Sequence, residues 1–106
     1  MKYNLAIDFG SVYTCIYKVG SGLVLKEPTL ISAENKDDEY QIVAMGEEAK
    51  KMQGKTDENT YIFSPISEGK IKSFEYAEVL INYFLDKTII GNIRSFPSPV
   101  GSFWKE

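Results

Sequence analysis

Histidine is absent from this sequence of 106 residues, and cysteine occurs only once, as Cys15. A single cysteine excludes a disulfide within the chain, and the lack of histidine excludes a histidine-based metal site or catalytic triad. Because no histidine is present to activate Cys15 as a nucleophile, we expect it to be a small buried strand residue.

Basic runs and long apolar runs are also missing. The net charge is −3 and the sequence isoelectric point is about 5.0, whereas a nucleic-acid-binding surface would need a basic stripe. No apolar run suggests a signal peptide or a membrane-spanning helix, so a cytoplasmic protein is expected. The apolar fraction of 43% and the charged fraction of 25% are ordinary for one modest globular domain.

Residues 5–17 are the stretch around which the chain is organised. Apolar and polar residues alternate over residues 2–7 and again over residues 12–17, which predicts two half-buried strands. Asp8, Gly10 and Ser11 lie at the turn between them. The pattern predicts a hairpin with a carboxylate, a glycine and a hydroxyl at its tip.

This turn has the composition of a phosphate-binding loop. Gly10 permits a backbone bend and the close approach of a ligand, and backbone N–H groups in such a turn can converge on a phosphate. We therefore predict phosphate contacts from Gly10, Ser11, Val12 and Tyr13, including the Ser11 hydroxyl. Asp8 is predicted to hold Mg²⁺ through water, since that ion keeps several waters. The alternative is an ordinary hairpin that binds nothing.

The rest of the chain predicts an α/β fold, with one mixed sheet of about five strands, one short helix and one long helix. Further strands are expected at residues 23–25, 29–33 and 40–44, with an extended segment at 60–63. The short helix is predicted at residues 46–53. The long helix is predicted at about residues 74–89, with Ser73 as its N-cap.

The long helix has an unusually broad apolar surface. One narrow face carries its polar residues: Glu75, Glu78, Asn82 and Asp86. A surface helix of a small domain usually has a narrower apolar stripe, so we expect cover on more than one side. One cover is the sheet of the first strands. The second is expected from chain outside this sequence or from another molecule, which favours self-association.

Several motifs in collinear order resemble one family. Residues 7–14 resemble the first phosphate loop of the actin/DnaK-type ATPases. The later motifs are similar to those of the bacterial actin homologue MreB: Val24-Leu25-Lys26-Glu27-Pro28-Thr29, Val43 to Met52, Gly54-Lys55-Thr56, Ser64-Pro65-Ile66 and Glu68-Gly69-Lys70-Ile71. The likeness runs from about residue 5 to residue 87 and identifies the chain as similar to the N-terminal portion of an MreB-like protein.

The resemblance implies the truncated N-terminal lobe of an RNase H-like, actin-like ATPase. Residues 1–33 would form the first strands of the large lobe with the phosphate loop. Residues 34–72 would form the inserted small lobe, and residues 73–106 the long helix and a tail returning to the large lobe. For a full-length relative it implies ATP and Mg²⁺ binding, filament formation and control of bacterial cell shape.

For these 106 residues the resemblance implies only one side of the phosphate site. The second phosphate loop and the adenosine pocket come from later chain, so weak ATP binding and no useful hydrolysis are expected. Tyr13 stands where the family has asparagine; its bulk would crowd the site, although its backbone N–H would remain.

Two alternatives stay open. One is a nucleotide-independent module that docks onto filaments of a full-length homologue through the long helix. The other is a chaperone ATPase or small-sugar kinase of the same superfamily, against which the segment from Val43 to Met52 speaks.

The tail suggests a second kind of contact. Apolar residues follow the long helix among turn formers: Ile89, Ile90, Ile93 and Phe96. The resemblance implies a loop here that touches the membrane peripherally, and the alternative is that these side chains cap the protein's own core. Residues 100–104 make a poor central strand because prolines and a glycine accompany them.

Overall fold

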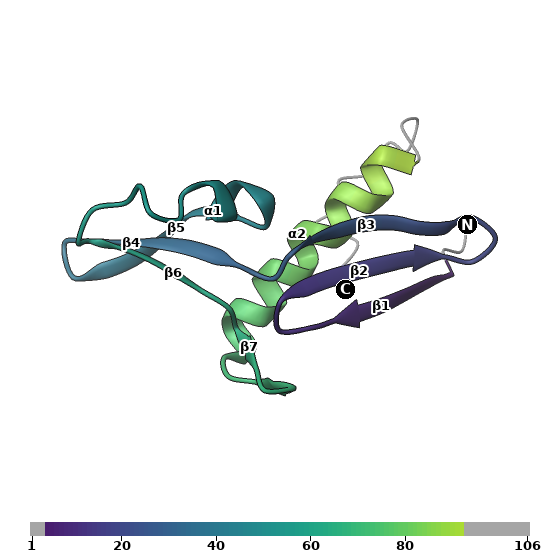
Figure 1. Cartoon of the computed structure of the whole chain (residues 1–106), viewed down its shortest axis with the longest axis horizontal. Coiled ribbons are helices and arrows are strands. Elements are labelled where there is room, and N and C mark those ends of the chain that lie inside the picture. Colours follow the sequence, from purple (N-terminus) through teal and green to yellow (C-terminus); the bar gives the residue numbers. More distant parts are fainter. Residues whose placement is uncertain (1–3, 93–106) are drawn as a thin grey trace.

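The computed structural model describes residues 4–92, which form eight strands and two helices (Figure 1). The first sheet has the order β1-β2-β3, with strands Leu5–Phe9, Tyr13–Lys18 and Gly22–Pro28. The second has the order β5-β4-β6, with β4 at Ile31–Lys36, β5 at Glu39–Met45 and β6 at Thr60–Phe63. The remaining elements are α1 (Glu47–Lys51), β7 (Ile66–Ser67), β8 (Lys70–Ile71) and α2 (Phe74–Asn92).

The predicted α/β class, with one short and one long helix, is confirmed, but the strands do not form one mixed sheet. All the strand pairs in the described residues are antiparallel, and the six longer strands divide into two three-stranded sheets. The division comes after Pro28, whose missing N–H ends the ladder of β3. The chain then crosses two residues before β4 begins. The expected boundary between residues 33 and 34 falls inside β4.

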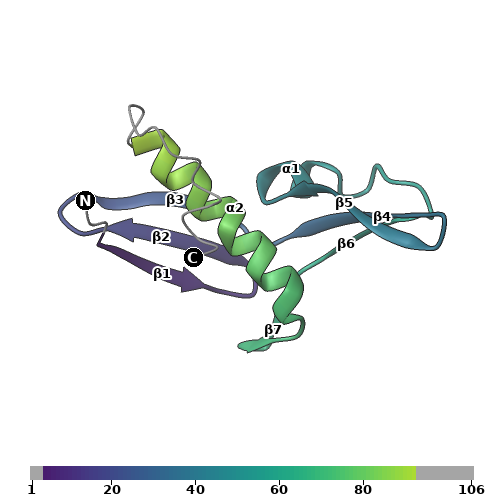
Figure 2. The ribbon, with the colours of Figure 1, turned by 180° about the vertical axis from the view of Figure 1, so that it is seen from behind.

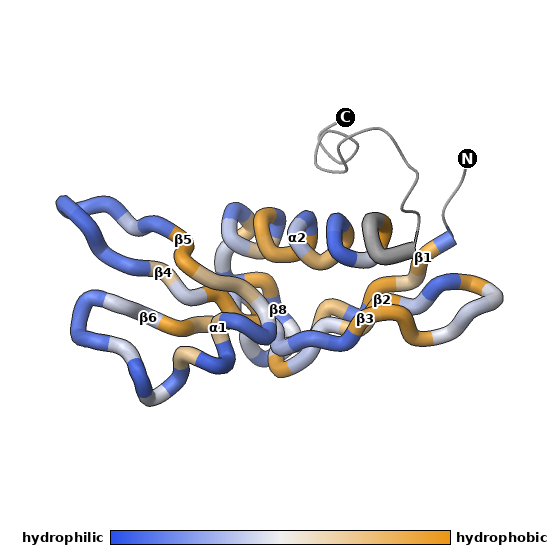
Figure 3. The backbone as a smooth tube through the Cα atoms, turned by 90° about the horizontal axis from the view of Figure 1, so that it is seen from above, coloured by the Kyte–Doolittle hydropathy of each residue, from blue (hydrophilic) through white to orange (hydrophobic). Residues whose placement is uncertain are grey.

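The long helix begins where its N-cap was predicted. The Tyr76 N–H donates to the Ser73 hydroxyl at 3.3 Å, and the Ala77 N–H donates to the Ser73 carbonyl at 2.9 Å. From there α2 runs diagonally across one side of the first sheet, and its N-terminal half lies against the near end of the second sheet (Figures 2 and 3). The helix therefore joins the two sheets into one body.

One hydrophobic core lies under α2 and takes side chains from both sheets. Its buried members are Ile16 and Leu25 from the first sheet, Ile31 from the second, and Leu80, Phe84 and Leu85 from the helix. The Phe63 ring of β6 also meets the Tyr76 ring edge-on, with 5.1 Å between centroids. The second cover of α2 is thus the chain's own second sheet, and the expectation that it must come from elsewhere is wrong for this part of the helix. Phe74 and Val79 remain 76% and 37% exposed.

The predicted exposed apolar tail is wrong at Ile89. This residue lies within α2, which continues to Asn92, and it is only 2% exposed, in agreement with the alternative that it caps the protein's own core. Ile90 also lies in α2, while Ile93, Phe96 and residues 100–104 lie outside the described residues. Between residues 4 and 92, neither helix combines the length and apolar character needed to cross a bilayer.

Candidate phosphate-binding site

The turn between β1 and β2 is closed by one backbone hydrogen bond. The Gly10 N–H donates to the Tyr13 carbonyl at 3.1 Å. A Cβ atom on Gly10 would lie only 2.8 Å from that carbonyl oxygen, closer than side chains approach backbone. Glycine is therefore required here by the tightness of the turn itself, and the Gly10 amide hydrogen is already used within it.

Two amides at the tip of this turn remain for a ligand. Ser11 and Val12 lie outside the strands, and both are exposed. Within residues 4–92, neither of their N–H groups has a backbone acceptor. The Ser11 hydroxyl lies at the same tip, while Tyr13 already belongs to β2, opposite Pro28. The Gly10 amide is thus used within the turn, while the Ser11 and Val12 amides remain for a ligand, and the predicted phosphate contacts stay a prediction.

Two buried threonines hold the turn from behind. The Thr29 N–H donates to the Val12 carbonyl at 2.9 Å, and the hydroxyls of Thr14 and Thr29 lie 2.8 Å apart. Both side chains are fully buried. Sequence reasoning missed this pair, although the alternation in residues 12–17 places Thr14 on the same face of β2 as Ile16. A polar residue on a core face is the signal that could have found it.

Asp8 lies near the turn as a single exposed carboxylate. It stands opposite Cys15, which in turn stands opposite Lys26, so the three share one row across the first sheet. The pKa of Tyr17 is raised above its ordinary value, most by the neighbouring Cys15 side chain and least by the charge of Asp8. The Tyr17 phenol therefore lies near this row of residues. No three metal-ligating side chains gather anywhere in residues 4–92. A lone carboxylate suits an ion that keeps most of its waters.

The Tyr13 ring contacts the strand on the far side from Asp8. The Lys26 ammonium lies 4.8 Å from the centre of this ring, within the range of a cation–π contact. Lys26 belongs to β3, and β2 separates that strand from β1, which carries Asp8. The contact favours a Tyr13 ring held toward β3. In that position the ring would crowd the predicted phosphate site less than was expected from tyrosine standing where the family has asparagine.

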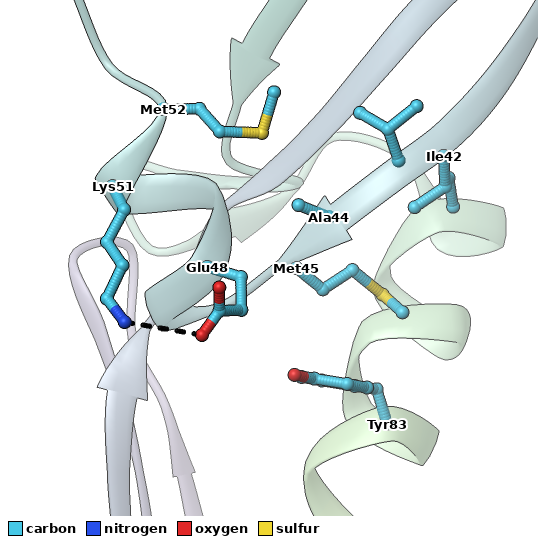
Figure 4. A pocket seen from close by; sticks show the side chains of 8 residues that line it. Ile42, Ala44, Met45, Glu48, Lys51, Met52 and Tyr83 are labelled. Atoms are coloured by element: carbon cyan, nitrogen blue, oxygen red, sulfur yellow. Dashed lines mark hydrogen bonds and ion pairs between the residues drawn. The ribbon is translucent and has the colours of Figure 1, made fainter.

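A hollow in the described residues lies elsewhere, between β5, α1 and α2 (Figure 4). It is an open groove of about 520 Å³, lined by Ile42, Val43, Ala44, Met45, Glu48, Lys51, Met52 and Tyr83. The Glu48–Lys51 ion pair, at 3.4 Å, lies beside it. None of the predicted site residues lines this groove. The β1–β2 turn itself is an exposed tip.

Comparison with known proteins gives this tip a context. A family model described as MreB/Mbl protein matches residues 2–100. The chain belongs to the MreB/Mbl family. The cell shape-determining protein Mbl of Bacillus subtilis is 31% identical over 94 residues, which are 89% of this chain and 28% of that protein. The cell shape-determining protein MreB of Escherichia coli is 33% identical over 98 residues, or 91% of this chain and 28% of that protein.

Solved MreB structures share the fold. MreB5 of Spiroplasma citri bound to ADP matches with a TM-score of 0.69 and 28% identity, over 82% of this chain and 26% of that one. The same protein bound to AMPPNP matches with a TM-score of 0.67 and 28% identity, over 89% and 26%. This MreB-type chain therefore spans little more than a quarter of the length of these relatives. The family assignment confirms the resemblance and decides against the chaperone and sugar-kinase alternative.

Proposed function

We propose that this chain supplies one side of the ATP site of an MreB-type actin homologue. The observation that carries the proposal is the tip of the β1–β2 turn, where two exposed amides without acceptors, those of Ser11 and Val12, lie beside the Ser11 hydroxyl. Their N–H groups would donate to phosphate oxygens, and Thr29 would keep the loop in place. ADP and AMPPNP are the nucleotides named for the two MreB5 structures.

Asp8 is proposed to hold a Mg²⁺ ion through water. Such an ion would neutralise charge on the phosphates, and one carboxylate is enough when the remaining ligands are waters and phosphate oxygens. Because the rest of the site belongs to later chain in the family, this chain alone should bind ATP weakly and show no useful hydrolysis. Steady ATP turnover by the purified chain, lost on Asp8→Ala, would overturn that expectation.

In a full-length protein the same residues would serve a filament that controls cell shape in the cytoplasm. We propose that the first sheet and α2 belong to the large lobe, and that β4 to β6 with α1 form the small lobe at a filament contact. Self-association follows from this role. Peripheral membrane contact is proposed only for Ile90, Ile93 and Phe96, since Ile89 is buried.

A docking module that works without nucleotide has less support. That alternative needs a broad free apolar face on α2, but Leu80, Phe84 and Leu85 are buried under the two sheets. Binding to filaments of a full-length homologue that survives Ser11→Trp would still favour it.

The direct test is a thermal melt with Mg-ATP and with adenosine. A ligand at 100 times its dissociation constant stabilises a protein by about 2.7 kcal/mol, so Mg-ATP at that excess should raise the melting temperature clearly. Adenosine, which has no phosphate, should not. Ser11→Ala and Asp8→Asn should reduce the Mg-ATP effect. Ser21→Ala is the matched control, because Ser21 is an exposed serine in the β2–β3 turn. Equal stabilisation by adenosine, or no loss in the Ser11 and Asp8 variants, would refute the proposal.

A further inference from the structure

One short segment, Glu27-Pro28-Thr29, touches the phosphate loop on one side and helix α1 on the other. We propose that this segment couples the conformation of the β1–β2 turn to the position of α1 and the second sheet. For the ligand in the turn, the inference rests on the proposed function; the coupling itself depends only on the contacts that follow.

On the turn side the contacts come from Thr29. Its N–H holds the Val12 carbonyl at 2.9 Å, and its hydroxyl is paired with that of Thr14 at 2.8 Å. Thr14 lies directly opposite Glu27 in the ladder between β2 and β3. A shift of the loop backbone at Val12 is therefore felt first at Thr29, within two residues of Glu27.

On the other side the contact is an unusual start to α1. Its first residue follows Gly46, which has no side chain to cap the helix. Instead, Oε1 of Glu27 accepts the Glu47 N–H at 3.0 Å from another strand. A Cβ atom on Gly46 would clash with that same oxygen and would lie 2.9 Å from Cε1 of Phe84. Strand β3 and the beginning of α1 are thus joined by a hydrogen bond and lie in close contact.

The second oxygen of Glu27 binds the long helix. The Lys87 ammonium donates to Oε2, and the Glu27 side chain is only 11% exposed. A carboxylate this buried is costly unless it is paired and hydrogen-bonded, so both partners are needed to keep it in place. Glu27 thus acts as a positioning residue that ties β3, α1 and α2 together at one point.

Pro28 completes the connection between the two ends. Proline fixes its own φ angle, and this residue is buried between Glu27 and Thr29. The segment is therefore stiff where it would have to transmit a displacement. Because coupling between two sites is reciprocal, a ligand that favours one position of the turn must also favour the matching position of α1. Likewise, a contact that favours one position of α1 must favour the matching position of the turn.

The experiment uses the methyl NMR signal of Met52, at the end of α1, in the whole chain. Met52 and Met45 line the groove between β5, α1 and α2, and the only other methionine is Met1 (Figure 4). Thr29→Val, which changes only the turn side, should shift the Met52 signal without any nucleotide. In a Glu27→Gln background this response should fall by at least half. Where Glu27→Gln fails to fold, Lys87→Met, at a half-exposed lysine, should weaken the response in the same direction.

The matched control is Glu48→Gln. Glu48 lies on α1 and pairs with Lys51 on the surface, and within residues 4–92 it has no hydrogen bond to Glu27, so the response to Thr29→Val should persist in this background. The coupling would be overturned if Thr29→Val left the Met52 signal unchanged. It would also be overturned if Thr29→Val shifted this signal as much in the Glu27→Gln background as in the wild type. In a separate experiment, titration of the wild-type chain with Mg-ATP should shift the same Met52 signal. No movement there, with the variant response intact, would count against the nucleotide proposal alone.

Discussion

Gly10 and Gly46 are fixed by the atoms beside them. The first faces the Tyr13 carbonyl inside the β1–β2 turn, and the second faces the Glu27 carboxylate at the start of α1. Neither contact can be read from the sequence, since each involves a backbone or side-chain atom whose position depends on the folded turn. The sequence did predict Gly10 and Ser11 as part of a candidate site, because a glycine and a hydroxyl between two alternating strands form a local pattern.

The first prediction concerns Gly10→Ala. The new Cβ would force the Tyr13 carbonyl to move, and overpacking of this kind costs about 1–3 kcal/mol. Urea unfolding should show that loss in the free energy of unfolding. Ser11→Ala, next to it and exposed, should stay within about 0.5 kcal/mol of the wild type. Equal stability of the two variants would contradict the tight turn.

The second prediction concerns the buried threonine pair. Thr29→Val keeps the shape but leaves the Thr14 hydroxyl without its partner, which should cost about 1–3 kcal/mol. The double variant Thr14→Val with Thr29→Val removes both hydroxyls and should cost clearly less than the sum of the single changes. A double-mutant cycle by urea unfolding measures this. Additive losses would mean that the two hydroxyls do not interact.

At the scale of elements, α2 holds the described part of the chain together because it packs on both sheets. The N-cap signal at Ser73 predicted the start of α2 at Phe74, and the alternation of apolar and polar residues predicted most of the strands. The sequence could not show that its apolar surface is covered by β4 to β6, because that depends on how the chain crosses after Pro28. The two-residue strands β7 and β8 were also missed, since two residues carry no periodicity.

The third prediction compares two neighbours on α2. Leu80 is fully buried, so Leu80→Ala should cost about 2–5 kcal/mol through lost contacts and a residual cavity. Val79 is 37% exposed, and Val79→Ala should cost much less. Thermal or urea unfolding of the pair provides the measurement. Similar losses at both positions would contradict the orientation of the helix.

The fourth prediction concerns the ion pair between α2 and β3. Partial burial alone would lower the pKa of Lys87, but the hydrogen bond and charge of Glu27 outweigh it, and Tyr83 adds to them, so the pKa is raised above its ordinary value of 10.5. A raised folded-state pKa means that the stabilisation is complete below the unfolded-state value and is lost as the pH rises through the folded-state value.

The measurement is the stability difference between wild type and Lys87→Met as a function of pH. It should stay constant up to about pH 10 and shrink at higher pH, where the lysine loses its proton. Taking the difference removes the titration of groups that both proteins share, such as Tyr17. A difference that does not change above pH 10.5 would show that Lys87 gains nothing from Glu27.

At the scale of the whole molecule, the described residues form an elongated body of 44 × 29 × 23 Å in which the β1–β2 turn and the groove beside α1 are separate features. The family was predictable because several short motifs keep their order along the chain. The coupling segment was not, because Glu27 and Lys87 are 60 positions apart and meet only in the fold.

The measurement that tests the central claim most directly is an amide NMR titration of the chain with Mg-ATP. We predict that the Ser11 and Val12 amide signals move first and furthest, while the Gly10 amide, already bonded to Tyr13, moves less. Adenosine at the same concentration should leave all three in place. Saturable shifts that avoid Ser11 and Val12, or that adenosine reproduces, would contradict the account.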